Sequence, residues 1–181
     1  MTSPAPSPSQ STDRARRAVF RTFGTLPKPL RRWLVRTIRP TWTAGSVAIL
    51  ERDDGRWLFV RPVYRKGWTL PGGLVDRGEH PAVTAVRETK EELGLTVEIT
   101  GGPWVVVDAE HSRFETIYRV GVVGEHDLDT IAVTTPELSA LGWFSPTDPP
   151  ELEDETAEVM VLVRQIADGG ATVHVKGDDH S

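Results

Sequence analysis

Three glutamates at short, regular spacing are the residues of this sequence whose types could do chemistry together. Glu88, Glu91 and Glu92 stand three and four residues apart, and on an α-helix this spacing places them within an arc of roughly 100° on one face. Two carboxylates about 5 Å apart repel by roughly 3 kcal/mol at an effective dielectric constant near 20, so such a face in a cleft needs cations. Carboxylate oxygens are the ligands that Mg²⁺ or Mn²⁺ accept, usually together with a phosphate substrate. The spacing therefore indicates a divalent-metal site, although glutamates on a helix face are more often solvated surface.

The residues around these glutamates favour the metal site. From Gly73 the sequence reads Gly, five residues, Glu79, seven residues, then Arg-Glu-x-x-Glu-Glu-x-Gly, which ends at Gly94. Seven fixed letters at about one in fifteen each arise from ordinary composition on the order of 10⁻⁸ times per start position. Residues 73–95 resemble the signature box of the Nudix hydrolases and match it at every fixed position. The one soft point is Thr89, where the family more often has an aliphatic residue.

The resemblance implies an activity and the residues that carry it. Nudix enzymes cleave nucleoside diphosphates linked to another group with the help of divalent metal, so we expect Mg²⁺, or Mn²⁺ in its place, and in-line attack of water on a phosphoanhydride bond of a nucleoside diphosphate or triphosphate derivative. Glu88, Glu91 and Glu92 match the positions that hold metal or activate water. Gly73 matches the residue whose carbonyl can add a metal ligand.

The remaining fixed positions of the box match residues with structural roles. Arg87 and Glu79 match a pair that secures the loop–helix–loop shape, and Gly94 suits the stop just beyond the helix. The alternative is a non-catalytic nucleotide-sensing module of the same fold, but such a module has no need of all three carboxylates. Isopentenyl diphosphate isomerisation uses this fold with a cysteine, and this chain has none.

Candidate substrate-binding residues outside the box are less specific. Arg61, Arg65 and Trp68 precede the glycine turn and could hold a phosphate and stack a base, although exposed arginines and a packed tryptophan explain them equally well. Some relatives take a further acidic ligand from the position before a late tryptophan. Gly142 occupies that position here, and Glu137 could substitute, although a solvated loop acid is the simpler explanation.

The substrate itself stays open. Two places past the box that carry markers for ADP-ribose or for dinucleoside polyphosphates in the family are occupied here by His111 and Ser112. Neither marker is therefore present, which leaves ADP-ribose, sugar nucleotides and damaged nucleoside triphosphates as candidates.

Strands and helices alternate in a way that indicates an α/β fold. We expect a Nudix-like α/β/α sandwich with a mixed β-sheet, with a hairpin around residues 53–55 joining its first two strands. The predicted helices and strands are, in order, strands Thr43–Glu51 and Trp57–Val63, helix Pro81–Leu93, strands Thr96–Thr100, Trp104–Ala109, Phe114–Val123 and Ala140–Phe144, and helix Glu153–Ala167.

Composition divides the chain of 181 residues into an arm and a body. Residues 1–12 are rich in Ser, Pro and Ala, so we expect disorder there. Residues 13–40 predict a basic helical N-terminal arm, since residues 1–40 hold nine Lys or Arg against one Asp, whereas the rest of the chain holds 12 against 25 acids. The Nudix domain is expected over residues 41–170, and a C-terminal tail over residues 171–181.

The arm is the candidate for contacts with partners. Its apolar stripe predicts packing on the body or in a homodimer, and its charge allows contact with an anionic membrane surface. Nucleic acid is disfavoured because no aromatic-rich motif accompanies the basic residues. The absence of cysteine, of a secretory signal in the first residues and of any apolar run near the ~20 residues that span a bilayer leads us to expect a cytoplasmic protein.

Overall fold

The computed structural model describes Pro27, residues 41–167 and residues 173–176. The chain divides into two compact units, Met1–Thr41 and Trp42–Ser181. The predicted disorder of residues 1–12 and the predicted helical arm over residues 13–40 fall, apart from Pro27, outside the described residues and stay predictions. Within the described part of the chain, no helix has the length and apolar character needed to cross a bilayer.

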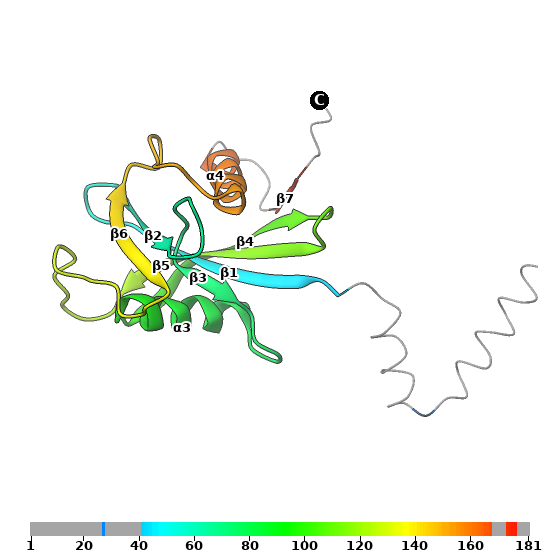
Figure 1. Cartoon of the computed structure of the whole chain (residues 1–181), viewed down its shortest axis with the longest axis horizontal. Coiled ribbons are helices and arrows are strands. Elements are labelled where there is room, and N and C mark those ends of the chain that lie inside the picture. The colour runs from blue at the N-terminus through cyan, green and yellow to red at the C-terminus, as the bar shows by residue number, and fades with distance from the viewer. Residues whose placement is uncertain (1–26, 28–40, 168–172, 177–181) are drawn as a thin grey trace, which may run out of the picture. The chain divides into compact units, whose positions relative to one another are not determined.

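The body is built on a five-stranded mixed sheet and a two-stranded sheet (Figure 1). The larger sheet has the order β3 (Gly72–Leu74), β1 (Thr43–Leu50), β5 (Arg113–Val122), β4 (Val97–Asp108) and β7 (Val173–Val175). β1 is parallel to β5 and β4 is parallel to β7, whereas β1–β3 and β4–β5 are antiparallel. The smaller sheet pairs β2 (Trp57–Pro62) with β6 (Leu138–Phe144) in antiparallel fashion.

Two helices cover opposite faces of the strands, as Figure 1 shows. The alternation of β1 demonstrates this: Ala48 and Leu50 pack in the core under one helix, whereas Val47 and Ile49 pack in the core under the other. The first core receives Ala85 and Leu93 from α3 (Pro81–Leu93), and the second receives Val159, Met160 and Leu162 from α4 (Asp154–Ala167). The predicted α/β/α sandwich with a mixed sheet is therefore confirmed.

The prediction that the first two strands pair as a hairpin is wrong, apart from the turn that joins them. β1 and β2 belong to different sheets and are joined by a single bridge between Glu51 and Trp57. β5 pairs with one edge of β1 over its whole length, and β3 pairs with the other edge at Gly45–Val47. β2 pairs instead with β6, and its side chains reach both cores, with Leu58 on the α3 side and Phe59 on the α4 side.

Three further strand predictions need correction. The two strands expected at residues 96–100 and 104–109 are one strand, β4, because β5 pairs with both segments. The register of this pairing shifts around Gly101. The glycine turn contains a strand, β3, and the segment expected as a tail contains β7. Both short strands depend on partners that are distant in the sequence, which local patterns cannot reveal.

Candidate active site

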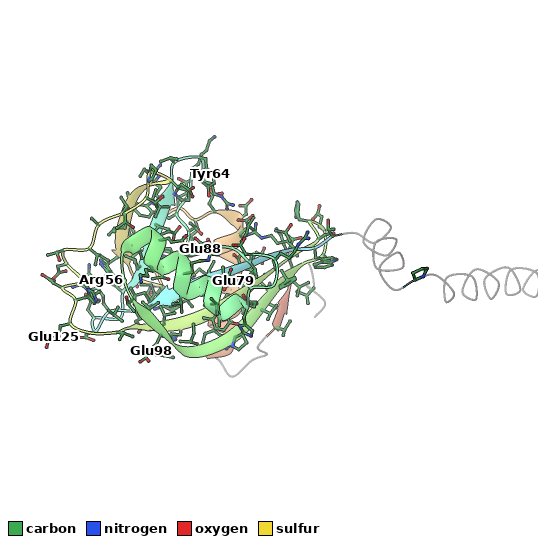
Figure 2. The ribbon with its side chains drawn as sticks, turned by 90° about the horizontal axis from the view of Figure 1, so that it is seen from below. Arg56, Tyr64, Glu79, Glu88, Glu98 and Glu125 are labelled. Atoms are coloured by element: carbon green, nitrogen blue, oxygen red, sulfur yellow. The ribbon has the colours of Figure 1, made fainter. Side chains whose placement is uncertain are left out.

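Local sequence signals define the helix that carries the box. His80 is the N-cap, its Nδ1 accepts the Ala82 N–H at 3.2 Å, and Pro81 occupies the first turn, where a missing N–H costs nothing. Gly94 ends the helix in the left-handed conformation at φ 71°, and its N–H donates to the Lys90 carbonyl. α3 therefore runs over the predicted residues 81–93 and carries Glu91, Glu92 and Glu88, the last of which is labelled in Figure 2.

Arg87 and Glu79 form a bidentate pair across the turn that precedes α3. Arg87 Nε donates to Glu79 Oε1 at 2.9 Å and Nη2 donates to Oε2 at 3.1 Å. Thr84 Oγ1 and the Asp76 N–H donate to the same carboxylate at 2.7 and 3.3 Å. The pKa of Glu79 is lowered to about 2, mainly by the hydrogen bonds from Arg87 and to a smaller extent by the hydrogen bond from Thr84. These contacts support the scaffold role that the family resemblance implies for this pair.

The three box glutamates have different surroundings. Arg87 Nη1 donates to Glu88 Oε1 at 2.8 Å and to Glu91 Oε2 at 3.2 Å, and the Glu91 side chain is 59% exposed whereas that of Glu88 is 18% exposed. Glu92 points instead toward β3, where its Oε2 accepts a hydrogen bond from the Gly72 N–H at 3.1 Å. Of the three, Glu88 and Glu92 line a cavity and Glu91 does not.

This cavity has a volume of about 340 Å³ and gathers residues from most of the elements described above. Its lining includes five of the residues predicted from the sequence, which are Arg65, Gly73, Glu88, Glu92 and Glu137. Glu137 thus lies with the box glutamates, although the sequence did not separate it from an ordinary loop acid. The position before Trp143, where some relatives carry an acid, is Gly142 within β6.

The surroundings of Glu92 disfavour its ionised form. Burial raises its pKa to about 8, and the charges of Glu88, Glu137 and Glu91 act in the same direction. The hydrogen bond from the Gly72 N–H opposes this rise without cancelling it. A cation beside Glu92 would relieve the repulsion and return the carboxylate to its ionised form.

The donor set is of the kind that suits a hard divalent cation. A Cβ on Gly73 would lie 2.4 Å from Glu88 Oε1, so only glycine lets this carboxylate approach the β3 backbone. Carboxylates and backbone carbonyls are the ligands of Mg²⁺ and Mn²⁺. In the described residues, however, no three acidic or histidine side chains lie close enough together to hold an ion. Glu88 and Glu91 both accept a hydrogen bond from Arg87.

Three of the sequence candidates lie away from the cavity lining. Arg61 is exposed, and its Nη2 donates to the Lys66 carbonyl at 3.4 Å. Trp68 packs edge-on against Phe144, with ring centroids 4.9 Å apart, in the core under α4. Glu91 is the third, on the solvent side of Arg87. Of the two explanations offered for Trp68, the structure therefore supports the packed tryptophan.

Sequence reasoning missed three charged residues of the lining, Arg113, Glu115 and Glu155. Arg113 and Glu115 stand at alternate positions of β5, and Glu155 lies in the first turn of α4. Burial raises the pKa of Glu115, and Arg113 opposes this rise. The only sign of these residues in the sequence was the alternation of Arg113 and Glu115 along one strand. That alternation does not reveal that β5 lies next to β1, the strand that pairs with β3.

Comparisons with known proteins agree with this geometry. The family model described as NUDIX domain matches residues 41–163. A MutT-like protein of Streptomyces ambofaciens is 28% identical over 143 residues, which are 79% of this chain and 88% of that protein. A CMP-5'-(N-acetyl-N-hydroxy-3-aminopropyl)phosphonate hydrolase of Streptomyces rubellomurinus is 71% identical over 55 residues, which are 28% of this chain and 27% of that protein.

A solved structure extends the likeness to three dimensions. The crystal structure of a MutT NUDIX hydrolase from Burkholderia pseudomallei aligns with a TM-score of 0.57 at 30% sequence identity and covers 67% of this chain and 98% of that one. The family model spans more than half of the 181 residues and includes the whole of the box and both helices' cavity residues. On this evidence the chain is a member of the Nudix hydrolase family.

Proposed function

We propose that this hydrolase uses Mg²⁺, with Mn²⁺ as an alternative, to cleave a phosphoanhydride bond of a nucleoside diphosphate or triphosphate derivative by in-line attack of water. One observation carries the proposal: the carboxylates of Glu88, Glu92 and Glu137 line the same cavity beside Gly72 and Gly73. Three acids around one partly closed space repel one another, and a phosphate substrate that arrives with divalent cations offsets this repulsion.

The acidic residues and Arg87 would have different roles in the reaction. Glu88 and Glu92 would hold the metal, with Glu137 as the acidic ligand from outside the box. When bound, the metal would neutralise charge on the diphosphate and lower the pKa of a bound water. Arg87 fixes the carboxylates of Glu88 and Glu91, and Glu91 stays a candidate for metal ligation or for activation of the water.

Water activation sets a geometric requirement. A carboxylate that removes a proton from the attacking water must come within about 2.6–3.2 Å of it, and such a base contributes roughly 10²- to 10⁴-fold to the rate. Glu88 and Glu92 both line the cavity, so both carboxylates are candidates for this base.

The proposal is tested with a substrate panel. The panel contains ADP-ribose, UDP-glucose, oxidised dGTP and a CMP-linked phosphonate, each with Mg²⁺, Mn²⁺ or EDTA, and is scored for nucleoside monophosphate, pyrophosphate and phosphate. We expect nucleoside monophosphate to be released only with metal. Glu88→Gln and Glu92→Gln are expected to lower kcat by about 10²- to 10⁴-fold with the fold intact, and Glu91→Gln shows whether the exposed glutamate takes part.

Glu98→Gln is the matched control, because Glu98 is an exposed glutamate of β4 and does not line the cavity. Its kinetics should equal those of the wild type. Binding of these nucleotides without turnover under either metal would overturn the proposal in favour of a nucleotide-sensing module.

A further inference from the structure

The loop between β5 and β6 brings Glu137 to the cavity from outside the box. This loop spans residues 123–137 and passes the C-terminal end of α3 before it enters β6 (Figure 1). Ile131 and Val133 pack against the core under α3, whereas Glu137 is exposed and lines the cavity. The position of this carboxylate therefore depends on how the last residues of the loop are held.

Thr134 holds the loop against the last turn of α3 with two hydrogen bonds. Its N–H donates to the Glu92 carbonyl at 2.8 Å, and its Oγ1 donates to the Glu91 carbonyl at 2.5 Å. The last carbonyls of an α-helix have no partner within the helix, so Thr134 completes this end of α3. A Cβ on Gly94 would lie 3.3 Å from Thr134 Cγ2, which shows that the two segments are in close contact. Thr134 thus joins the loop to the backbone of two box glutamates.

The connection from Thr134 to Glu137 is short and constrained. Only Thr135 and Pro136 separate the two residues. The Leu138 N–H donates to the Thr135 carbonyl at 3.5 Å and closes a turn with Pro136 at its second position, where the fixed φ of proline is favourable. The Glu137 N–H also donates to Thr135 Oγ1, at 3.3 Å. A displacement of Thr134 should therefore displace Glu137 as well.

Glu137 is also held from its other side. Its carbonyl accepts the Val63 N–H at 2.8 Å, and Val63 directly follows β2. The backbone of Glu137 therefore lies between the end of α3 and the end of β2. Mg²⁺ requires oxygen ligands in a nearly ideal octahedral arrangement, so the placement of each carboxylate matters. Residues that orient metal ligands typically contribute about 10- to 100-fold to the affinity for the metal.

We propose that Thr134 is a positioning residue, which sets the place of the Glu137 carboxylate relative to the box glutamates and thereby the affinity of the site for its divalent cation. The inference rests on the proposed function, which makes Glu137 the acidic ligand from outside the box. Thr134 itself is not one of the described residues that line the cavity, so it acts on the cation only through the residues to which it is joined.

Two variants at this position test the hydroxyl group. Thr134→Val keeps the shape of the side chain and the backbone hydrogen bond to Glu92 but removes the donor to Glu91, whereas Thr134→Ser keeps that donor. Mn²⁺ alone is titrated into each protein and the free ion is followed by electron paramagnetic resonance. We expect Thr134→Val to bind Mn²⁺ about tenfold more weakly than the wild type and Thr134→Ser to bind it as the wild type does. Equal affinity of Thr134→Val and the wild type would refute the inference.

Thr130→Val is the matched control. Thr130 is an exposed residue of the same loop, and its Oγ1 donates to the Asp127 carbonyl at 2.9 Å, within the loop itself. Its loss should leave the Mn²⁺ affinity and the turnover unchanged. A loss of affinity equal to that of Thr134→Val would show that any loosening of the loop has this effect, which contradicts a specific role of Thr134. Because both threonines are exposed, both variants should fold, and their melting temperatures are measured alongside.

A double-mutant cycle tests whether Thr134 acts through Glu137. In the Glu137→Gln background, we expect Thr134→Val to change the Mn²⁺ dissociation constant by less than about twofold, because the carboxylate that Thr134 positions is gone. A further loss of about tenfold in that background would place the effect in α3 and refute the inference. If Glu137→Gln binds Mn²⁺ too weakly to titrate, kcat/KM of the same four proteins is compared by the same criterion.

The same titrations separate this inference from the proposed function. Wild-type affinity for Mn²⁺ in both Glu88→Gln and Glu92→Gln would show that the cation does not bind at the box, which contradicts the proposed function. If these two variants lose affinity and Glu137→Gln does not, the cation binds at the box without Glu137. In that case the hydrolase proposal stands and the inference about Thr134 is refuted.

Discussion

The guanidinium of Arg87 contacts three glutamates of the box. It holds Glu79 through two hydrogen bonds and reaches Glu88 and Glu91 through Nη1. The pKa of Arg87 is raised by Glu79 and Glu88, with the hydrogen bond to Glu79 as the largest cause. At the residue scale, this one side chain links the turn before α3 to the acids on it, so its loss should affect shape and chemistry together.

The pair of Glu79 and Arg87 makes stability depend on pH in the acid range. The pKa of Glu79 is about 2 in the folded protein and ordinarily 4.5, so the pair stabilises the fold fully above pH 4.5 and loses this contribution as the pH falls toward 2. We expect Glu79→Gln to melt at a lower temperature than the wild type above pH 4.5. Thermal unfolding from pH 6 to pH 3 should show the two melting temperatures converge.

Salt provides the check on this explanation. An ion pair near the surface weakens with ionic strength, so 1 M NaCl should reduce the difference at pH 6. A difference in melting temperature that stays constant from pH 6 to pH 3 would contradict the linkage to Glu79 titration.

At the scale of elements, two neighbouring glycines of β3 position the box in different ways. A Cβ on Gly72 would lie 2.3 Å from the Ser46 carbonyl oxygen of β1, at a φ of 153°, so this glycine permits the close approach of two backbones. A Cβ on Gly73 would meet the carboxylate of Glu88, which is the far end of a flexible side chain. The first contact concerns the fold and the second concerns the site.

Alanine substitutions should separate these two roles. Gly72→Ala forces backbone atoms apart and should lower stability by about 1–3 kcal/mol. Gly73→Ala should leave the melting temperature nearly unchanged, because Glu88 can move, and should lower kcat because Glu88 is displaced. Calorimetric melting and steady-state kinetics measure the two effects.

Gly101→Ala is the control for both, since its Cβ would meet neighbouring side-chain atoms no closer than 3.4 Å. It should change neither stability nor kcat appreciably. Full activity of Gly73→Ala with its substrate would show that the position of the Glu88 carboxylate beside β3 is unimportant.

At the scale of the whole body, the cavity depends on the sheet having a helix on each face. α3 brings the box glutamates, and α4 with β5 brings Glu155, Arg113 and Glu115. Because Glu92 is a half-buried acid whose pKa is raised from 4.5 to about 8, the cation-free protein loses stability as the pH rises through this range, and a bound cation removes this cost. Metal binding should therefore increase the stability of the folded protein measurably.

We expect Mg²⁺ at 100 times its dissociation constant to stabilise the wild type by about 2.7 kcal/mol, relative to EDTA. Glu92→Gln should lose most of this stabilisation. At pH 9 in EDTA, the variant should melt at a higher temperature than the wild type, because the wild-type carboxylate is ionised there without a cation. Differential scanning calorimetry at pH 6 and pH 9 makes the measurement.

Glu98→Gln again serves as the control and should respond to Mg²⁺ as the wild type does. An equal Mg²⁺ response in Glu92→Gln would show that the ion binds elsewhere.

The sequence by itself determined the features that depend on neighbouring residues. The box spacing identified the family, and the limits of α3 followed from Pro81 and Gly94, because caps and helical periodicity are local. The tertiary structure alone decided that Glu92 is half-buried and lines the cavity whereas its neighbour Glu91 is exposed, and that Glu155 lies beside Arg113. It also decided that β1 and β2 part into separate sheets. Burial, charge partners and strand pairing arise from segments far apart in the chain, whose meeting is fixed only when the two cores pack.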